Sequence, residues 1–184
     1  IKIRTDAPDY SNIPVKMYDW EYSCYADAEE EIPPGSPELK GKSVTMTSFF
    51  DANLYHDMIS GKSVTGVLHM LNQTPIDWFS KLQSTVETAT FGSEYVAART
   101  CTEQIIDLRL TLRYLGVPIN GCSMVFGDNE SVINSAAIPH SRMHKRWVAL
   151  SYHRVRWAVA AGITNIYHIA GKKNPADILS KHWD

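Results

Sequence analysis

Alternating apolar and polar positions mark the stretch 43–51 as a β-strand. The even positions from Val44 to Phe50 share one side, and the odd positions from Thr45 to Asp51 share the other. β-Branched and aromatic residues, which fit a pleated surface, are frequent here. The pattern predicts a strand whose last residue, Asp51, is either a strand terminator or a functional carboxylate.

Two further strands are predicted in the first half of the chain. Residues 63–71 are apolar on both sides, which is typical of a central strand. A turn signal at 72–75 separates them from a third strand at 76–82. The larger apolar residues of that strand share one side: Ile76, Trp78 and Leu82. With 53–61 expected to form a turn-containing loop, the short connections predict an antiparallel meander.

The period becomes helical from Ser93 to Leu115, and Gly116 follows as a stop signal. Apolar residues spaced by three and four form one stripe: Ala98, Cys101, Ile105, Leu108, Leu112 and Leu115. Glu94 lies in line with this stripe, in the predicted first turn. An acid there either complements the helix dipole or belongs to a site, and the pattern leaves both interpretations open.

Shorter elements fill the rest of the chain. We predict a strand at 122–126, a short helix at 132–137, a basic helix at about 143–161 and a last strand at 163–169. The expected inner residues of the basic helix are Trp147, Leu150, Val155 and Ala158. Positive charge is expected from Arg142, Lys145, Arg146, Arg154 and Arg156. A closing helix is predicted with Asn174 at N-cap, Pro175 at N1 and Asp177 at N3.

The order of these elements brings four acids to one edge of the sheet. If the first strand points up, the long helix begins at the top edge and the fourth strand runs parallel to the first. Right-handed crossovers place strands one and four side by side. Ligands of open α/β sheets bind at the carboxyl ends of the strands where the chain order reverses. The acids expected at that edge are Asp51, Glu94, Asp128 and Asp177.

Four carboxylates packed together repel one another and raise each other's pKa values. Divalent cations resolve this repulsion, since Mg²⁺ takes oxygen ligands and is commonly held by a few carboxylates together with substrate phosphates. Two such ions about 3.5–4 Å apart stabilise the attacking and leaving oxygens of a displacement at phosphorus. The constellation therefore predicts metal-dependent phosphodiester hydrolysis.

Composition changes the picture for residues 1–42. Acid blocks and clustered prolines make poor core material, so we expect an extended tether outside a domain at 43–184. The tether either docks through Tyr18, Trp20 and Tyr22 or is a linker without chemistry. Acids outnumber bases nine to four in residues 1–40, whereas bases outnumber acids fourteen to eleven in the rest. The domain is therefore compatible with a polyanionic substrate.

Membrane, secretory and disulfide-based interpretations have no support in the sequence. No apolar run approaches 18 residues, and no charged-then-apolar leader opens the chain. The three cysteines are odd in number and lack C-x-x-C spacing, so neither a zinc site nor a disulfide framework is indicated. We expect a reducing, intracellular setting and, because the first residue is Ile1, a longer parent protein.

Eight short segments carry a family resemblance: Phe50–Asn53, Pro75–Trp78, Ser80–Gln83, Ser93–Ala97, Gly127–Ser131, His140–Arg142, Tyr152–Arg156 and Asn174–Lys181. Each is weak alone, but the ordered set, which covers residues 43–184 almost continuously, is specific. It resembles the ribonuclease H domain of copia-type retrotransposon polyproteins, and diatom members most closely.

The resemblance implies an α/β fold of the ribonuclease H type, with a five-stranded mixed sheet in the order 3-2-1-4-5 flanked by helices. It implies cleavage of the RNA strand of RNA/DNA hybrids, with the reverse transcriptase domain of the same polyprotein as partner and residues 1–42 as the connection to it. The expected location is a cytoplasmic virus-like particle or the nucleus. The implied metal-binding acids are Asp51, Glu94, Asp128 and Asp177.

The sequence departs from the family at three places. Many relatives have a second acid two residues after the first, where this chain has Asn53. Asp51 is therefore the less ambiguous metal ligand of this motif, because no second acid competes with it. The usual acid before the Glu94 motif is replaced by Phe91–Ser93. The mobile histidine of cellular and retroviral enzymes has no counterpart in the loop 170–174, and His168 is expected to stay in its strand. The Tyr152–His153 pair matches the sequence motif of the family, but a packed helix face would explain it equally well.

The main hypothesis assigns a role to each acid. Asp51 bridges two Mg²⁺ ions, for which Mn²⁺ can substitute; Glu94 and Asp128 help to hold the ion nearer the leaving 3′ oxygen, and Asp177 the ion that activates water. The products then carry 5′-phosphate and 3′-hydroxyl groups. Contacts with 2′-hydroxyls or phosphates are predicted for Asn129, Lys172 and Lys173, and for polar residues around Thr90. The alternatives are an integrase-like DNA strand-transfer nuclease and a non-catalytic module that binds hybrids.

Overall fold

The computed structural model describes residues 3–13, 18–20, 23–143 and 146–181, and this part of the chain contains five strands, four α-helices and two 3-10 helices. In chain order the elements are β1 (Met46–Asp57), β2 (Lys62–Leu71), β3 (Thr74–Leu82), α1 (Thr90–Tyr114), β4 (Ser123–Gly127), α2 (Glu130–Ala137), the 3-10 helix η1 (Arg146–Val148), α3 (Ala149–Ala160), β5 (Thr164–His168), the 3-10 helix η2 (Gly171–Lys173) and α4 (Asp177–Ser180).

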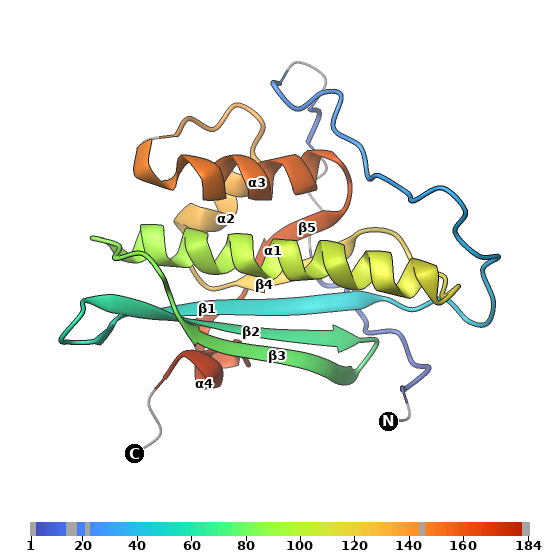
Figure 1. Ribbon diagram of the computed structural model, residues 1–184, viewed down its shortest axis with the longest axis horizontal. Coiled ribbons are helices and arrows are strands. Elements are labelled where there is room, and N and C mark those ends of the chain that lie inside the picture. The colour runs from blue at the N-terminus through green and yellow to red at the C-terminus, as the bar shows by residue number, and fades with distance from the viewer. Residues whose placement is uncertain (1–2, 14–17, 21–22, 144–145, 182–184) are drawn as a thin grey trace.

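The strands form one mixed sheet in the order β3-β2-β1-β4-β5. β1, β2 and β3 are antiparallel neighbours, while β4 is parallel to β1 and to β5. Helices α1, α2 and α3 lie on one side of the sheet and α4 on the other (Figure 1). The predicted meander and the strand order implied by the resemblance are both confirmed.

β1 differs from its prediction because it does not end at Asp51. The strand continues to Asp57, and Ala52 and Asn53 still pair with β2. The turn begins only at Asp57, whose carboxylate accepts hydrogen bonds from the main-chain N–H of Ile59 and the hydroxyl of Ser60. The predicted loop 53–61 is therefore mostly strand, and Asp51 lies inside β1 rather than at its end.

The core lies between the sheet and α1, where the helical stripe was predicted. Met46 and Phe50 of β1 are fully buried, as are Ala98, Cys101 and Ile105 of α1. The last member of the stripe, Leu115, is 71% exposed because α1 ends before it. The helix also begins at Thr90, three residues earlier than predicted, which moves Glu94 from the first turn to the second.

The third strand faces the core with a different set of residues. A register irregularity at His69/Met70 shifts the alternation of β3, so Phe79 packs against the core and Trp78 is 68% exposed. The predicted common inner side of Ile76, Trp78 and Leu82 was wrong, although Ile76 does pack against the core.

The basic helix is shorter than predicted and buries a different face. Val155 and Ala158 are buried as expected, but Trp147 and Leu150 are exposed, and Lys145 lies outside the described residues. Arg156, which was expected to add to the positive charge of this helix, is 2% exposed. Its guanidinium donates to three main-chain oxygens at the end of α2: those of Ser135, Ile138 and Pro139.

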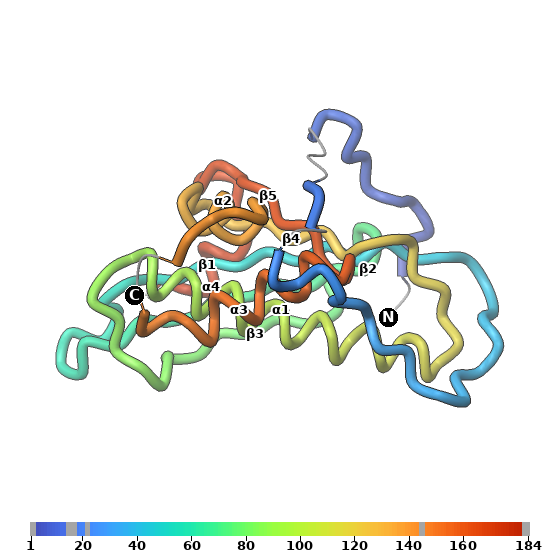
Figure 2. The backbone as a smooth tube through the Cα atoms, turned by 90° about the horizontal axis from the view of Figure 1, so that it is seen from above, coloured from blue at the N-terminus to red at the C-terminus, as the bar shows by residue number. Residues whose placement is uncertain are grey.

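The acidic segment before β1 is extended, and it contacts α1 and α3. Figures 1 and 2 show the part between residues 23 and 42 running alongside these helices. Trp20 and Tyr25 lie over the buried guanidinium of Arg156. The Glu30 carboxylate forms ion pairs with Arg109 and Arg113 of α1. Docking by aromatic residues is thus seen for Trp20, whereas Tyr22 lies outside the described residues; the boundary at residue 43 stays a prediction.

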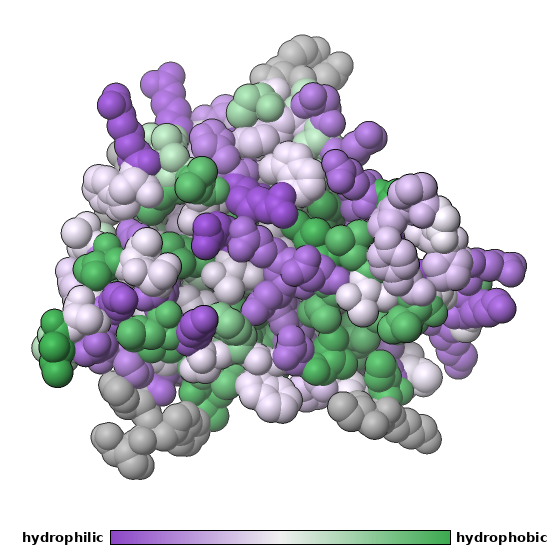
Figure 3. Space-filling model, viewed as in Figure 1, coloured by the Kyte–Doolittle hydropathy of each residue, from purple (hydrophilic) through white to green (hydrophobic). Residues whose placement is uncertain are grey.

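The outer surface over α1 and α3 is mixed in character. Figure 3 shows hydrophilic and hydrophobic residues interspersed over this face. Among the helices of the described residues, none is both long and apolar enough to cross a membrane.

Candidate active site

Three of the four predicted acids meet where β1 and β4 separate. Asp51, Glu94 and Asp128 each offer a carboxylate oxygen, and these oxygens lie within 4.8 Å of one another. The parallel ladder between β1 and β4 extends only to the pair Phe49 and Phe126, two residues before each aspartate. The two central strands therefore separate where the acids lie, as expected for a ligand site at a point where the chain order reverses.

The fourth acid, Asp177, lies at the rim of the same cavity. The cavity has a volume of about 380 Å³, and Asp177 lines it together with the other three acids. It is nevertheless outside the group of mutually close oxygens, since one of its own oxygens pairs with Nζ of Lys181 at 2.6 Å. The prediction that four acids share this edge matches the geometry, but only three of them form a tight cluster.

The position of α4 next to the acids depends on Asn174. Its side-chain nitrogen donates to the main-chain oxygen of Phe50 at 2.9 Å, and its oxygen accepts from the N–H of Ala176. α4 consequently begins at Asp177 with Ala176 at its N-cap, so the predicted helix start with Asn174 at N-cap was wrong. The asparagine instead ties the segment before α4 to β1.

A glycine in β2 allows α4 to lie close to the sheet. Gly66 is the cross-strand partner of Asp51, and a Cβ at Gly66 would lie only 2.7 Å from the main-chain oxygen of Ala176. This close approach brings the hydroxyl of Ser180 to Asp51, to which it donates a hydrogen bond. The buried hydroxyl thereby fixes one carboxylate oxygen of Asp51.

The environment of the cluster favours protonated carboxyl groups. Burial, together with the nearby charges of Asp128 and Asp177, raises the pKa of Asp51 despite the hydrogen bond from Ser180. Burial first, and then the charges of Asp51 and Asp128, raise the pKa of Glu94 to about 9, although the N–H of Ala52 opposes this shift. Without a cation, ionising Asp51 and Glu94 together is costly.

The donor set fits divalent cations. All three side chains offer oxygen, the ligand that Mg²⁺ and Mn²⁺ prefer. Oε2 of Glu94 is buried and has no hydrogen-bond partner among the described residues. Buried polar atoms are normally paired, so this buried carboxylate oxygen is suited to a cation.

Of the three residues predicted to contact the substrate, one lines the acid cavity and two do not. Asn129 lines the cavity, but its side-chain oxygen already accepts from the N–H of Val132 as the N-cap of α2. Lys172 and Lys173 are exposed in η2 and are not among the residues that line the cavity. The turn still passes close to the acids, because a Cβ on Gly171 would lie 2.9 Å from the carboxylate of Asp128.

Two histidines considered from the sequence have structural contacts. His168 ends β5, and its Nε2 lies 3.1 Å from the main-chain oxygen of Asp128, so it contacts the backbone of the site rather than a carboxylate. His153 is hydrogen-bonded through Nδ1 to the hydroxyl of Tyr25, in the acidic segment. Tyr152 is buried in the core, whereas His153 is exposed and contacts the acidic segment.

The sequence pointed less clearly to three other residues of the cavity: Asn53, Ser180 and Lys181. Ser180 and Lys181 lie three and four residues after Asp177, so they share its helical side, and that spacing was a usable signal. Asn53 was noted only as a missing acid.

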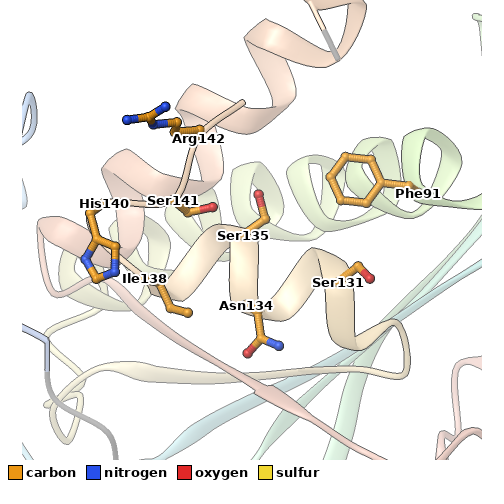
Figure 4. A pocket seen from close by; sticks show the side chains of 8 residues that line it. All are labelled: Phe91, Ser131, Asn134, Ser135, Ile138, His140, Ser141 and Arg142. Atoms are coloured by element: carbon orange, nitrogen blue, oxygen red, sulfur yellow. The ribbon is translucent and has the colours of Figure 1, made fainter. Parts of the chain in front are cut away.

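A second cavity, of about 450 Å³, adjoins the acid cavity along α2. Thr90 and Asn129 line the acid cavity, while their near neighbours Phe91 and Ser131 line the second one. Figure 4 shows α2 and the loop that follows it on one side, with Phe91 reaching in from α1. The remaining lining residues are mostly polar: Asn134, Ser135, Ile138, His140, Ser141 and Arg142.

No family model matches the chain, but curated proteins do. The Retrovirus-related Pol polyprotein from transposon TNT 1-94 of Nicotiana tabacum is 29% identical over 141 residues, which is 77% of this chain and 10% of that protein. This chain is homologous to the Pol polyproteins of copia-type retrotransposons. The Pol polyprotein from transposon RE2 of Arabidopsis thaliana is 28% identical over 144 residues, with the same coverage. The chain spans about a tenth of the length of these relatives.

Solved structures establish the fold of this chain as that of ribonuclease H. RNase H1 from Halobacterium salinarum NRC-1 superposes with a TM-score of 0.57 at 14% identity, over 74% of this chain and 94% of the archaeal one. LC11-RNase H1, solved in complex with an RNA/DNA hybrid, gives a TM-score of 0.58 at 15% identity, over 73% of this chain and 93% of that one.

Proposed function

We propose that this protein is a metal-dependent endoribonuclease that hydrolyses the RNA strand of RNA/DNA hybrids. The observation that carries the proposal is the cluster of buried Asp51 and Glu94 with half-buried Asp128, in which one oxygen of Glu94 has no hydrogen-bond partner among the described residues. The ribonuclease H fold, the hybrid bound to LC11-RNase H1 and the retrotransposon Pol homologues support it. The proposed setting is reverse transcription, with the reverse transcriptase region of the parent polyprotein as partner.

The three clustered acids would hold divalent cations, with Asp177 contributing from the rim. Bound Mg²⁺ or Mn²⁺ supplies Lewis acidity toward the phosphodiester and lowers the pKa of water. The chain's own residues prepare the ligands. Ser180 fixes one oxygen of Asp51. Glu94 would hold a cation in its ionised form, so cation binding would tighten as pH rises toward the raised pKa of Glu94.

The second cavity would hold the nucleic-acid backbone next to the acids. Arg142 provides a permanent positive charge, and the serine hydroxyls and the amide of Asn134 provide donors for phosphate oxygens. Phe91 offers an apolar surface at the boundary between the two cavities. A hybrid lying along α2 would thus place one phosphodiester at the acids, where hydrolysis would leave 5′-phosphate and 3′-hydroxyl ends.

The test is cleavage of an end-labelled RNA/DNA hybrid by the full chain with Mg²⁺ or Mn²⁺, beside single- and double-stranded RNA. Asp51→Asn and Asp128→Asn are each expected to lower the cleavage rate at least about a hundredfold, the scale on which an electrostatic catalyst acts. Far-UV circular dichroism should not change. Asp77→Asn is the matched control, since it makes the same change at an exposed position of the edge strand β3.

The outcomes separate the proposal from its alternatives. Cleavage that persists in Asp51→Asn would refute it. Hybrid binding by the wild type without metal-dependent cleavage would favour the non-catalytic module, and joining of DNA ends would favour the integrase-like nuclease. Loss of activity in Asp77→Asn as well would show that the aspartate substitutions act through folding.

A further inference from the structure

β1 becomes irregular shortly after Asp51. Its pairing with β2 is regular as far as Asn53, but the register shifts between Asn53 and Asp57. Within this stretch Tyr55 has a φ of 54°, in the left-handed region that residues other than glycine rarely adopt. Irregularities of this kind bend a strand and redirect the side chains that follow, and they are frequent next to active sites.

The irregularity brings His56 to the side of Asn53. In a regular strand, residues three positions apart point to opposite faces of the sheet. Here the side-chain nitrogen of Asn53 lies 3.2 Å from Nδ1 of His56. An amide nitrogen can only donate, so Nδ1 accepts and the orientation of the Asn53 amide is set. The strained turn at Tyr55 therefore holds one side chain of the active-site cavity in place.

Asn53 lines the cavity of the acids, whereas His56 does not. Two other uncharged side chains of the cavity are already engaged, because Ser180 donates to Asp51 and the oxygen of Asn129 caps α2. Asn53 presents an amide with both donor and acceptor capacity and adds no charge beside the acids. A ribose 2′-hydroxyl, which also both donates and accepts, has complementary chemistry.

We propose that Asn53 contacts a 2′-hydroxyl of the strand that is cut and that His56 is its positioning residue. The inference rests on the proposed function and adds a specificity determinant to it. Asn53 would thereby contribute to the selection of RNA over DNA.

The test is a cycle that combines protein variants with substrate variants. The full chain is assayed on an all-ribonucleotide hybrid and on hybrids with a single 2′-deoxynucleotide at each position around the cut. For the wild type, one such position should lower kcat/KM about three- to tenfold, the effect of one lost hydrogen bond between neutral groups. Asn53→Ala and His56→Ala should cleave the all-ribonucleotide hybrid less well by a similar factor and show no further loss at that position.

Rescue and control variants separate positioning from folding. The side-chain oxygen of His56→Asn can replace Nδ1 as acceptor. This variant should therefore show the same loss of kcat/KM as the wild type on the hybrid with the single 2′-deoxynucleotide. Ile59→Ala, at a 98% exposed position of the same hairpin, should behave as the wild type throughout. If the 2′-deoxynucleotide lowers kcat/KM equally in the wild type and in Asn53→Ala, this inference is overturned, while the proposed function still stands. A wild type without metal-dependent hybrid cleavage would overturn both.

Discussion

Two clusters of buried and half-buried charged side chains in this molecule are built in opposite ways. In the arginine clamp, formed by Glu30, Arg109 and Arg113, the carboxylate of Glu30 accepts from Arg109 at 2.7 and 2.8 Å and from Arg113 at 2.6 Å. In the acid cluster, Asp51, Glu94 and Asp128 bring together like charges. The first arrangement balances its charges within the chain, and the second does not.

The pKa shifts of two glutamates express the same difference. Burial alone would raise the pKa of Glu30, but the hydrogen bonds and charges of Arg109 and Arg113 hold it below its ordinary value. The pKa of Glu94 is raised because burial and like charges act in the same direction. A balanced cluster stabilises the fold, whereas an unbalanced one lowers stability and is explained by a ligand that the chain does not supply.

The largest expected effect on stability is that of Glu30→Gln. Removing the charge of Glu30 leaves Arg109, whose side chain is 4% exposed, without its anion, and breaking a buried pair in this way costs about 3 kcal/mol. The free energy of unfolding at pH 7, from denaturant titration, measures the loss. Because the folded-state pKa of Glu30 is lowered, the stability it provides is present above about pH 4.5 and is lost as pH falls through that lowered value.

Glu29→Gln is the control, since it removes an exposed neighbouring charge in the same acidic run. It should change the free energy of unfolding by less than about 0.5 kcal/mol. If the two variants are equally stable, residues 23–38 are a linker and the clamp adds nothing to the fold. Hybrid cleavage should persist in both variants, because neither residue lines the acid cavity.

In the acid cluster, removing a carboxyl group should raise the free energy of unfolding instead of lowering it. In the presence of chelator at pH 7, Glu94→Gln should raise the free energy of unfolding by about 2 kcal/mol, because the wild type must take up a proton at Glu94 when it folds and glutamine does not. The folded protein retains the proton of Glu94 up to about pH 9, whereas the unfolded chain releases it near pH 4.5. Wild-type stability therefore falls as pH rises across this window, and the Glu94→Gln variant should lose that part of the slope.

Added Mg²⁺ should stabilise the wild type more than the Glu94→Gln variant. Saturating Mg²⁺ at about a hundred times its Kd should stabilise the wild type by about 2.7 kcal/mol and Glu94→Gln by less. Denaturant titrations with and without the cation measure this difference. The explanation of the acid cluster fails if the wild type and the variant keep identical pH slopes and identical responses to Mg²⁺.

Periodicity was sufficient for the order of the elements but not for their ends and faces. The meander and the buried stripe of α1 followed from side-chain spacing, which reports the period of a regular element. The exposure of Trp78 depends on a register irregularity, and the burial of Arg156 depends on main-chain oxygens at the end of α2 and on rings from the acidic segment. Both are set by tertiary contacts that spacing does not encode.

The site was predictable to the extent that topology determines it. Asp51, Glu94 and Asp128 converge because adjacent parallel strands and the start of α1 share one edge. The placement of Asp177 instead depends on the hydrogen bond from Asn174 to β1 and on the pairing with Lys181. The contact between Asn53 and His56 requires the left-handed turn at Tyr55, which no alternating pattern indicates.

The smallest expected effect concerns the pairing of Asp177 with Lys181. Lys181 is 60% exposed, and an ion pair at such a position contributes little to folding, so Lys181→Ala should leave the free energy of unfolding unchanged within error. If Asp177 contributes to the cation site from the rim, removing its competing ammonium group should tighten Mg²⁺ binding about two- to fivefold. Calorimetric titration measures this, with Lys81→Ala as the control for a lysine of β3 that does not line the cavity. Unchanged Mg²⁺ affinity in Lys181→Ala would restrict the metal centre to the three clustered acids.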